Sequence, residues 1–290
     1  MAFNLQTFKT RALTSVAFVI IMLGGLLINH WTFLFLFTVI HFGCWLEYHK
    51  LIGKIEPEYK NISSAHAFGV MLAGWGFMLW MTNDAYIVAG IKLSEAGWFL
   101  MLINLLALPV IEILLSRNFN LKTLSISLAG LLYISFSCGC MIDMRSEGMI
   151  SGSFFGIDLG LVLPLLVIIT IWINDTMAYI VGSFIGKTQL SSISPKKTWE
   201  GTIGGVLLAV ITVTVCGYVF LKADVVQLII ISTITCIAGI FGDLLESKLK
   251  RLAGAKDSGN IMPGHGGFLD RFDSLLVATI FVWLYIKLFL

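Results

Sequence analysis

Charged residues are scarce in this 290-residue sequence: they make up 12% of the chain, whereas hydrophobic residues make up 58%. A soluble domain carries about 25% charged residues. The low share excludes an ordinary soluble protein and indicates an integral membrane protein. The net charge of +2 is too small to indicate binding to nucleic acid, so we expect no such partner.

Several catalytic signatures are also missing. The sequence has no P-loop, no Gly-x-Ser-x-Gly motif and no zinc-binding motif. Its five cysteines are odd in number, fall inside apolar runs and lack the spacing of metal ligands. We therefore interpret them as small buried hydrophobic residues.

Long apolar runs fill most of the chain. A helix needs about 20 such residues to cross the hydrocarbon core. Nine runs qualify: 13–29, 31–49, 64–82, 96–116, 122–142, 159–183, 201–221, 225–245 and 274–290. Only Asn29 and His30 separate the first two, which predicts a tight helical hairpin, and the stretch 83–93 is too short to span. We predict an all-α polytopic membrane protein with about nine transmembrane helices, forming a single domain over 1–290.

Basic residues are unevenly distributed between the two sides of this predicted bundle. One side holds the N-terminus and all but four of the 19 lysines and arginines; the four are Lys92, Arg145, Lys222 and Lys287. The positive-inside rule places the basic side, and with it the N-terminus, in the cytoplasm. The two longest charged loops, 184–200 and 246–273, share that face, so we expect the chemistry there.

The run 159–183 contains an aspartate. Asp175 falls on one helical stripe with Ala178, Tyr179, Gly182 and Gly186. For the two glycines we favour close helix packing. An ionisable residue within a span is costly and usually faces a cavity or a partner, so we favour a functional role for Asp175.

The stretch SPKKTWEGTIGG, residues 194–205, reads as a helix start with Ser194 as N-cap and Pro195 at the first helical position. Lys196 and Lys197 would then lie in the first turn, where the helix dipole disfavours cations. Both lysines could anchor the chain at anionic lipid. The alternative is a bound phosphate, which would explain why two lysines lie beside the free backbone N–H groups of a helix start.

Two acidic pairs flank the loop that precedes the last apolar run. Asp243 and Glu246 share one helix face, and Asp270 and Asp273 share another if the last helix begins by residue 270. One of the latter two would suffice as a helix cap, whereas two pairs could hold Mg²⁺, which prefers carboxylates shared with substrate phosphates. The basic residues after Glu246 (Lys248, Lys250 and Arg251) suit a helix C-terminus and could be simple anchors. The intervening glycines (Gly264, Gly266 and Gly267) allow close approach to a ligand, and His265 is equally a phosphate contact or a loop residue.

Carboxylates for a divalent cation, together with clustered basic residues for phosphates, are the components of phosphoryl or nucleotidyl transfer. The stretch SKLKRLAGAKDSGNIMPGHGGFLDRFD, residues 247–273, resembles the signature of CTP:phosphatidate cytidylyltransferases, also called CDP-diacylglycerol synthases. The ordered features are a serine, a basic pair, Lys-Asp, His-Gly-Gly and Asp-Arg-x-Asp. The stretches NDTMAYIVGSFIGK and SPKKTWEGTIGG resemble companion segments of the same family, whereas the N-terminal half matches only in hydropathy. Met262 and Ser192 depart from the family pattern, and neither departure affects a charged position.

The resemblance implies an enzyme of phospholipid synthesis that joins CTP and phosphatidic acid to give CDP-diacylglycerol and pyrophosphate. It further implies Mg²⁺ as cofactor, alone or with a second cation, a location in the bacterial inner membrane, and a homodimer. Residues 1–158 would form a packing and dimer scaffold, and residues 159–290 would hold the catalytic helices and cytoplasmic loops.

The resemblance also assigns expected roles to residues of this sequence. The expected metal ligands are Asp243, Asp270 and Asp273. The expected phosphate contacts are Lys196, Lys197, Lys250, Arg251, His265 and Arg271. Further substrate-binding residues are expected to be Asp175, Tyr179, Ser194, Thr198, Glu200, Ser247, Lys256, Asp257, Gly264, Gly266 and Gly267.

Two other functions fit parts of the pattern. A CTP-dependent polyprenol kinase would use similar groups to transfer the γ-phosphate. An ion-coupled transporter would explain carboxylates within spans, but the polar residues here cluster on one face instead of at mid-membrane in two matching halves. Glu47 and Glu112, near predicted cytoplasmic ends of their spans, are interpreted as structural.

Overall fold

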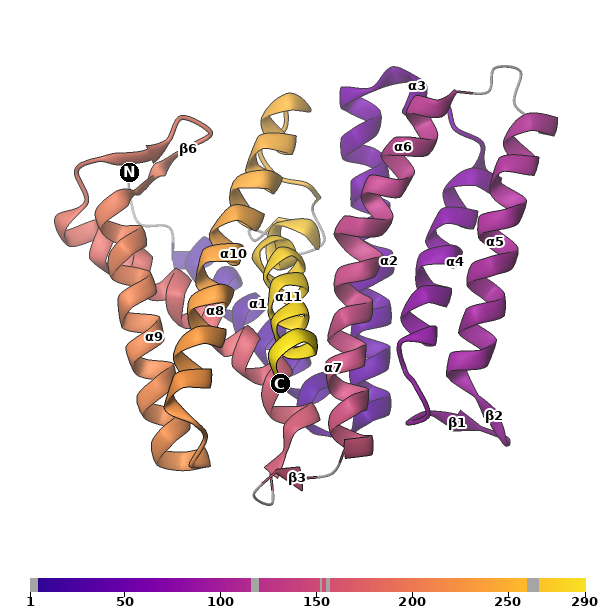
Figure 1. Cartoon of the computed structure of the whole chain (residues 1–290). Helices are drawn as coiled ribbons and strands as arrows, with labels where there is room; N and C mark the ends of the chain where they lie inside the picture. Colours follow the sequence, from indigo (N-terminus) through magenta and orange to yellow (C-terminus); the bar gives the residue numbers. More distant parts are fainter. Residues whose placement is uncertain (1–4, 116–119, 152, 155–156, 260–265) are drawn as a thin grey trace.

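The computed structural model describes residues 5–115, 120–151, 153–154, 157–259 and 266–290. The chain is built almost entirely of helices, arranged as a bundle (Figure 1). The helices are α1 (Leu5–Leu27), α2 (His30–Ile55), α3 (Pro57–Lys60), α4 (Ser64–Trp80), α5 (Leu93–Leu115), α6 (Leu121–Gly130), α7 (Ser137–Ser151), α8 (Leu159–Ile185), α9 (Trp199–Leu221), α10 (Val225–Leu252) and α11 (Leu269–Phe289). A π-helical turn, η1 (Leu131–Phe136), joins α6 to α7 without a break.

The prediction of an all-α polytopic membrane protein is confirmed. Seven helices in the described part of the chain are long and apolar enough to cross a membrane, with α6, η1 and α7 counted as one. The other two predicted spans are also helical. Helix α4 has 17 residues, and the apolar stretch of α1 whose side chains are described is Thr14–Leu27.

The turn between α1 and α2 is held by a capping box. The Asn29 side chain accepts from the Thr32 backbone N–H at 2.9 Å, and the Thr32 hydroxyl accepts from the Asn29 N–H at 3.2 Å. Two backbone donors that the start of α2 would leave unpaired are thereby satisfied. The predicted helical hairpin is confirmed.

Three short antiparallel hairpins connect helices: β1 (Ile87–Val88) with β2 (Ile91–Lys92), β3 (Ser153–Phe154) with β4 (Ile157–Asp158), and β5 (Gln189–Ser191) with β6 (Ser194–Thr198). The helix start predicted at Ser194 is therefore wrong. Thr198 is the N-cap of α9 and its hydroxyl accepts from the Gly201 N–H at 3.2 Å. Pro195 is compatible with a two-stranded ribbon, where one edge of each strand carries no ladder hydrogen bonds.

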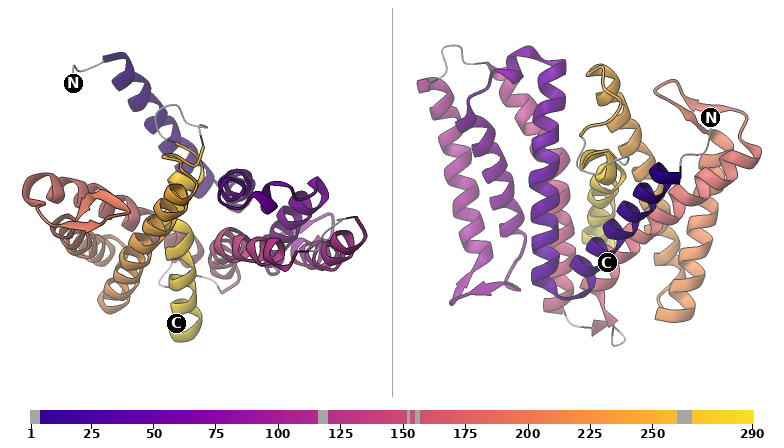
Figure 2. Two further views of the ribbon diagram at one scale, coloured as in Figure 1. Left: turned by 90° about the horizontal axis from the view of Figure 1, so that it is seen from above. Right: turned by 180° about the vertical axis from the view of Figure 1, so that it is seen from behind.

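The helices form two groups with α10 and α11 between them, as the view from above shows (Figure 2). One group comprises α2 and α4–α7, and the other comprises α8 and α9 with the β5–β6 hairpin. The basic loops lie together at the end of the bundle that carries α3, β6 and the C-terminal end of α10, opposite the β1–β2 and β3–β4 hairpins (Figure 1). The two longest charged loops thus share one face, as predicted.

Small residues bring α8 and α9 together. A Cβ added at Gly201 would overlap the Ala178 carbonyl and the backbone of Gly182, and one at Gly205 would overlap Ala178. The predicted close packing of this stripe is confirmed. The cysteines Cys44, Cys138, Cys140 and Cys236 are buried as predicted, but Cys216 is exposed because α9 turns most of its surface outward.

Helix α2 is tied to the centre of the bundle by polar contacts. The Trp45 indole donates to the Ser135 hydroxyl at 3.0 Å, and the His41 ring contacts the same oxygen at 3.0 Å. Trp45 and His41 are fully buried. These contacts fix the rotation of α2 and thereby the direction in which Glu47, one half-turn further along, points.

Candidate active site

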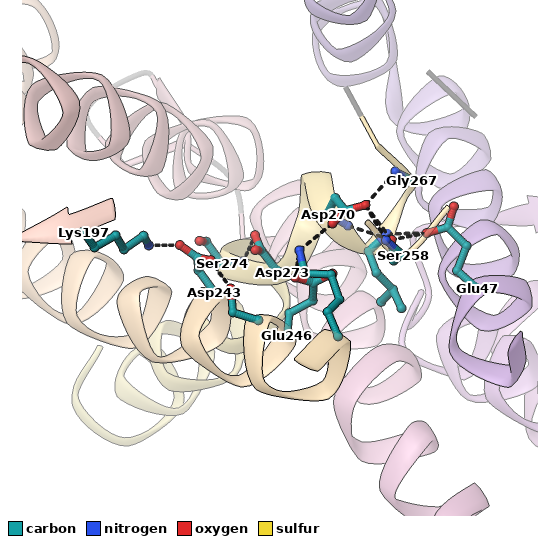
Figure 3. A network of polar contacts seen from close by, with 12 residues as sticks. Glu47, Lys197, Asp243, Glu246, Ser258, Gly267, Asp270, Asp273 and Ser274 are labelled. Atoms are coloured by element: carbon teal, nitrogen blue, oxygen red, sulfur yellow. Dashed lines mark hydrogen bonds and ion pairs between the residues drawn. The ribbon is translucent and has the colours of Figure 1, made fainter. Parts of the chain in front are cut away.

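Asp270 organises the loop that precedes α11. Its Oδ2 accepts from the backbone N–H groups of Ser258 and Gly267 and from the Ser258 hydroxyl, each at 2.8 Å (Figure 3). Its Oδ1 accepts from Lys250 Nζ at 2.6 Å. Helix α11 begins at Leu269, as the predicted pairing of Asp270 with Asp273 requires. One carboxylate therefore joins α10, α11 and both ends of the loop between them.

Glycine is required at the end of this loop. Gly266 has a φ of +84°, a backbone conformation that side chains other than glycine disfavour, and a Cβ there would overlap the Asp270 carboxylate. A Cβ at Gly267 would overlap the carboxylate of Glu47. Gly264 and His265, which the sequence also selects, lie outside the described residues.

Glu47 of α2 supports the same loop from the N-terminal half of the chain. Its side chain is buried, and its Oε2 accepts from the Ser258 hydroxyl at 2.8 Å and from the Leu269 N–H at 2.9 Å. A Cβ at Gly259 would also overlap it. The sequence interpretation of Glu47 as structural omits this contact, because nothing in the sequence places residue 47 beside residues 258–269.

Lys250 lies between two carboxylates. It pairs with Glu246, one turn earlier on α10, and with Asp270 of α11. Glu246 is fully buried, and the Asp270 side chain is 7% exposed. A buried charge is tolerated when it is paired and hydrogen-bonded. The lysine thus locks the end of α10 to the start of α11.

A second charged cluster lies at the other end of the network (Figure 3). Lys197 of β6 pairs with Asp243 of α10, with side-chain exposures of 32% and 23%. Gly242 allows the backbone of α10 to touch that of Asp273 on α11, which brings Asp243 and Asp273 together. Asp175 of α8 interacts electrostatically with Lys197 and with the exposed Arg271.

Lys197 is held in this cluster at an electrostatic cost. Burial lowers the pKa of its ammonium group from the usual value, while the charges of Asp175 and Asp273 act in the opposite direction. Three acidic residues from α8, α10 and α11 thus converge on one cationic side chain from a strand. The cluster is partly exposed, so a phosphorylated substrate can reach it.

The remaining predicted residues are distributed around these two clusters. Ser247 donates to Asp243 Oδ1 at 3.3 Å, and the Glu200 carboxylate accepts from the N–H groups of Lys187 and Thr188 and closes the base of the β5–β6 hairpin. Ser194 pairs with Ser191 in that hairpin. Five further predicted residues have side chains exposed around the network: Tyr179, Lys196, Arg251, Lys256 and Asp257.

The two lysines of the SPKK stretch do not lie in the first turn of a helix. They belong to β6, so the predicted conflict with the helix dipole does not arise. Lys196 is exposed and Lys197 turns inward to Asp243. Only Lys197 is therefore built into the cluster.

The carboxylates divide by what they contact. Within the described residues, no three Asp, Glu, His or Cys side chains lie close enough together to form a metal site on their own. Both oxygens of Asp270 are already engaged by four donors. Asp243 follows Gly242, which packs against the backbone of Asp273, and Asp243 pairs with the partly exposed Lys197. Two carboxylates completed by substrate phosphates are a donor set that fits Mg²⁺.

Comparison with known sequences agrees with the site. The sequence profile of the Cytidylyltransferase family matches residues 9–289. The chain is 30% identical to phosphatidate cytidylyltransferase of Bacillus subtilis (strain 168) over 283 residues, covering 97% of this chain and 98% of that protein. It is 32% identical to the protein of the same name from Haemophilus influenzae over 269 residues, covering 86% and 90%.

A plant relative matches over a shorter stretch. The chain is 41% identical to phosphatidate cytidylyltransferase 4, chloroplastic, of Arabidopsis thaliana over 129 residues, which covers 44% of this chain and 33% of that protein. The two bacterial relatives, by contrast, match over most of their length, and the match to the Bacillus subtilis protein takes in the N-terminal helices that resemble the family only in hydropathy. The chain is a membrane protein of the Cytidylyltransferase family.

Proposed function

We propose that this protein transfers the cytidylyl group of CTP to phosphatidic acid, forming CDP-diacylglycerol and pyrophosphate for phospholipid synthesis. The observation that carries the proposal is the convergence of Lys197, Asp243 and Asp273 on one partly exposed cluster, in a chain whose full-length relatives are named phosphatidate cytidylyltransferase. An oxygen of the lipid phosphate attacks the α-phosphorus of CTP, and the bond from the α-phosphorus to the bridging oxygen of the pyrophosphate breaks. The lipid phosphate is itself the nucleophile, so no covalent intermediate with the protein is needed.

The chain's own residues bind and orient the phosphates in this reaction. Lys197 offers a cation to the phosphates of CTP, and the exposed Arg271 offers another beside Asp175. Asp243 and Asp273 would hold Mg²⁺, which when bound neutralises charge on the phosphate oxygens. Asp270, Lys250 and Glu47 hold the loop and the start of α11, and with it Asp273, in place.

The orientation and assembly also belong to the proposal. Most lysines and arginines lie at the end of the bundle that carries this cluster, which supports a cytoplasmic active site in the bacterial inner membrane. The homodimer and the assignment of residues 1–158 as its scaffold remain predictions from the family resemblance. Glu47 shows that this N-terminal half also contributes directly to the loop of the site.

Isotopic labelling distinguishes the proposal from a lipid kinase. Purified protein is incubated with phosphatidic acid, a polyprenol, Mg²⁺ and CTP labelled at either the α- or the γ-phosphate. We expect α-label in the lipid and γ-label in pyrophosphate, because only cytidylyl transfer keeps the α-phosphorus on the lipid product. Incorporation of γ-label into a lipid would support the kinase. Ion movement across vesicles without pyrophosphate release would support the transporter.

Removing the Glu47 carboxylate is expected to lower turnover by about tenfold. Glu47→Ala leaves the Leu269 N–H without its acceptor and removes one of the two carboxylates within reach of the Ser258 hydroxyl, and each buried hydrogen bond to a charged group is worth about 1.5–3 kcal/mol. Glu47→Gln keeps one acceptor oxygen and should recover part of the activity. Turnover at saturating CTP and thermal unfolding are measured together.

The control for this prediction is Glu58→Ala, since Glu58 is an exposed glutamate near the same end of the bundle. This substitution should leave the turnover rate and the midpoint of thermal unfolding unchanged. If Glu47 acts on the site through Ser258, then Ser258→Ala and Glu47→Ala should be non-additive in the turnover rate. Additive losses would show that Glu47 contributes only to general stability.

A further inference from the structure

A second cleft lies away from the Lys197 cluster. It has a volume of about 1090 Å³ and is bounded by the C-terminal end of α2, by α3, by the start of α4 and by residues 257–259. Helix α3 and the C-terminal end of α2 lie at the basic end of the bundle (Figure 1). Among the described residues that line this cleft, Asp257 is the one predicted substrate contact.

Three lysines line the cleft: Lys50, Lys54 and Lys60. All three side chains are exposed, and within the described residues none of them forms an ion pair. Asp257 is the one carboxylate among the described lining residues, so two positive charges are left uncompensated. Lys197 and Lys250, by contrast, are paired with carboxylates.

The cleft changes from cationic to apolar along its depth. On α2 the lining residues Lys54, Lys50 and Leu46 follow one another at intervals of four, so each lies about 6 Å further from the cytoplasmic end. Leu46 is 49% exposed, and Phe68, which lines the cleft from α4, is 60% exposed. Inorganic phosphate has no apolar part that would use these two side chains, and a nucleotide has no aliphatic chain to follow the cleft past them.

We propose that this cleft binds a glycerophospholipid with a phosphate monoester headgroup, at a position distinct from the Lys197 cluster. The lysines would hold the phosphate, and Leu46 and Phe68 would contact the acyl chains. A phosphate monoester carries about −1.5 to −2 charges at pH 7, which matches the two uncompensated positive charges better than a phosphodiester with one. The identification of this lipid as the substrate, phosphatidic acid, rests on the proposed function. The change from lysines to apolar side chains along the cleft is independent of it.

Ser258 connects the cleft to the active-site loop. It lines the cleft, and its hydroxyl oxygen lies 2.8 Å from both Glu47 Oε2 and Asp270 Oδ2, so its one proton is shared between the two carboxylates. A lipid phosphate in the cleft would therefore lie next to the residue that joins α2 to the start of α11. The cleft is in a position to collect substrate from the membrane beside the loop.

Photocrosslinking tests the proposal on the intact protein in nanodiscs. A phosphatidic acid analogue with a photoreactive acyl chain is irradiated without CTP, and labelled peptides are mapped by mass spectrometry. We expect labelling within residues 46–71. Lys50→Ala combined with Lys54→Ala should reduce that labelling about 10- to 30-fold, because each lysine near an anionic lipid contributes about 1 kcal/mol. Lys187→Ala with Lys248→Ala removes the same charge from exposed lysines outside the cleft and should not reduce it.

Competition identifies the ligand. Unlabelled phosphatidic acid should suppress the labelling more strongly than phosphatidylglycerol, and inorganic phosphate should have little effect. Equal labelling of the cleft variant and the wild type would overturn the proposal, as would competition by inorganic phosphate as strong as that by the lipid. Asp243→Asn should keep the cleft labelling. A wild-type protein that labels in the cleft but forms no CDP-diacylglycerol would refute the proposed function and leave this inference standing.

Discussion

Replacing Asp243 with asparagine is expected to lower CDP-diacylglycerol formation by at least about 10²-fold, a typical loss when a group that stabilises charge in the transition state is removed. The substitution removes one of the two carboxylates proposed to hold Mg²⁺ and leaves Lys197 without its paired charge. The expected signature is a shift in metal dependence: the remaining activity should require a higher Mg²⁺ concentration. Pyrophosphate release is measured over a Mg²⁺ titration.

Asp84→Asn is the matched control for this experiment. Asp84 is an exposed aspartate that pairs with Lys92 at 2.9 Å beside the β1–β2 hairpin, at the opposite end of the bundle. It should leave both the rate and the Mg²⁺ dependence unchanged. An Asp243→Asn protein with wild-type activity would refute the proposed role of Asp243 as a metal ligand.

Asp270→Asn should also lose about 10²-fold in turnover, but by a different route. Asp270 accepts from four donors on two oxygens, whereas asparagine has one acceptor oxygen and one NH₂ donor. In either orientation the amide NH₂ faces a donor, either Lys250 or the group formed by Ser258 and Gly267. The loop and the start of α11 should loosen, so the midpoint of thermal unfolding falls along with the rate.

Metal dependence separates the roles of Asp270 and Asp243. If Asp270 positions the loop, the Asp270→Asn protein keeps the wild-type Mg²⁺ concentration for half-maximal rate. A rise equal to that of Asp243→Asn would instead make Asp270 a metal ligand, as the family resemblance alone implies. Asp224→Asn is the control for the substitution itself, since Asp224 caps α10 by accepting from the Gln227 N–H and asparagine caps a helix equally well.

Local features of the sequence predict much of the fold. Hydropathy finds the helices because a span must be apolar over a minimum length, whatever its neighbours are. The break of two residues, Asn29 and His30, predicts the first helical hairpin because it separates two apolar runs that are neighbours in the sequence, and the structure shows a capping box in that turn. The small residues of α8 predict close packing because their spacing along one helix is visible in the sequence, although the partner, α9, is identified only by the structure.

The β5–β6 hairpin shows where local reasoning fails. Ser-Pro can begin either a helix or a strand, and the choice depends on contacts from outside the segment. Here the Glu200 carboxylate holds the N–H groups of Lys187 and Thr188, and Thr198 caps α9 in place of Ser194. The helix begins at Trp199, and Lys197 reaches Asp243 from a strand.

The sequence by itself determined that this chain is a helical membrane protein whose acidic and basic residues collect on one face, because hydropathy and charge act residue by residue. It also determined the family, because the ordered motif near the C-terminus is long and specific. Only the tertiary structure decided how the carboxylates divide between a loop-holding group around Asp270 and the group of Asp243 and Asp273 around Lys197. Likewise, only the structure placed Glu47 against Leu269, because a hydrogen bond between residues 222 positions apart depends on how the helices pack.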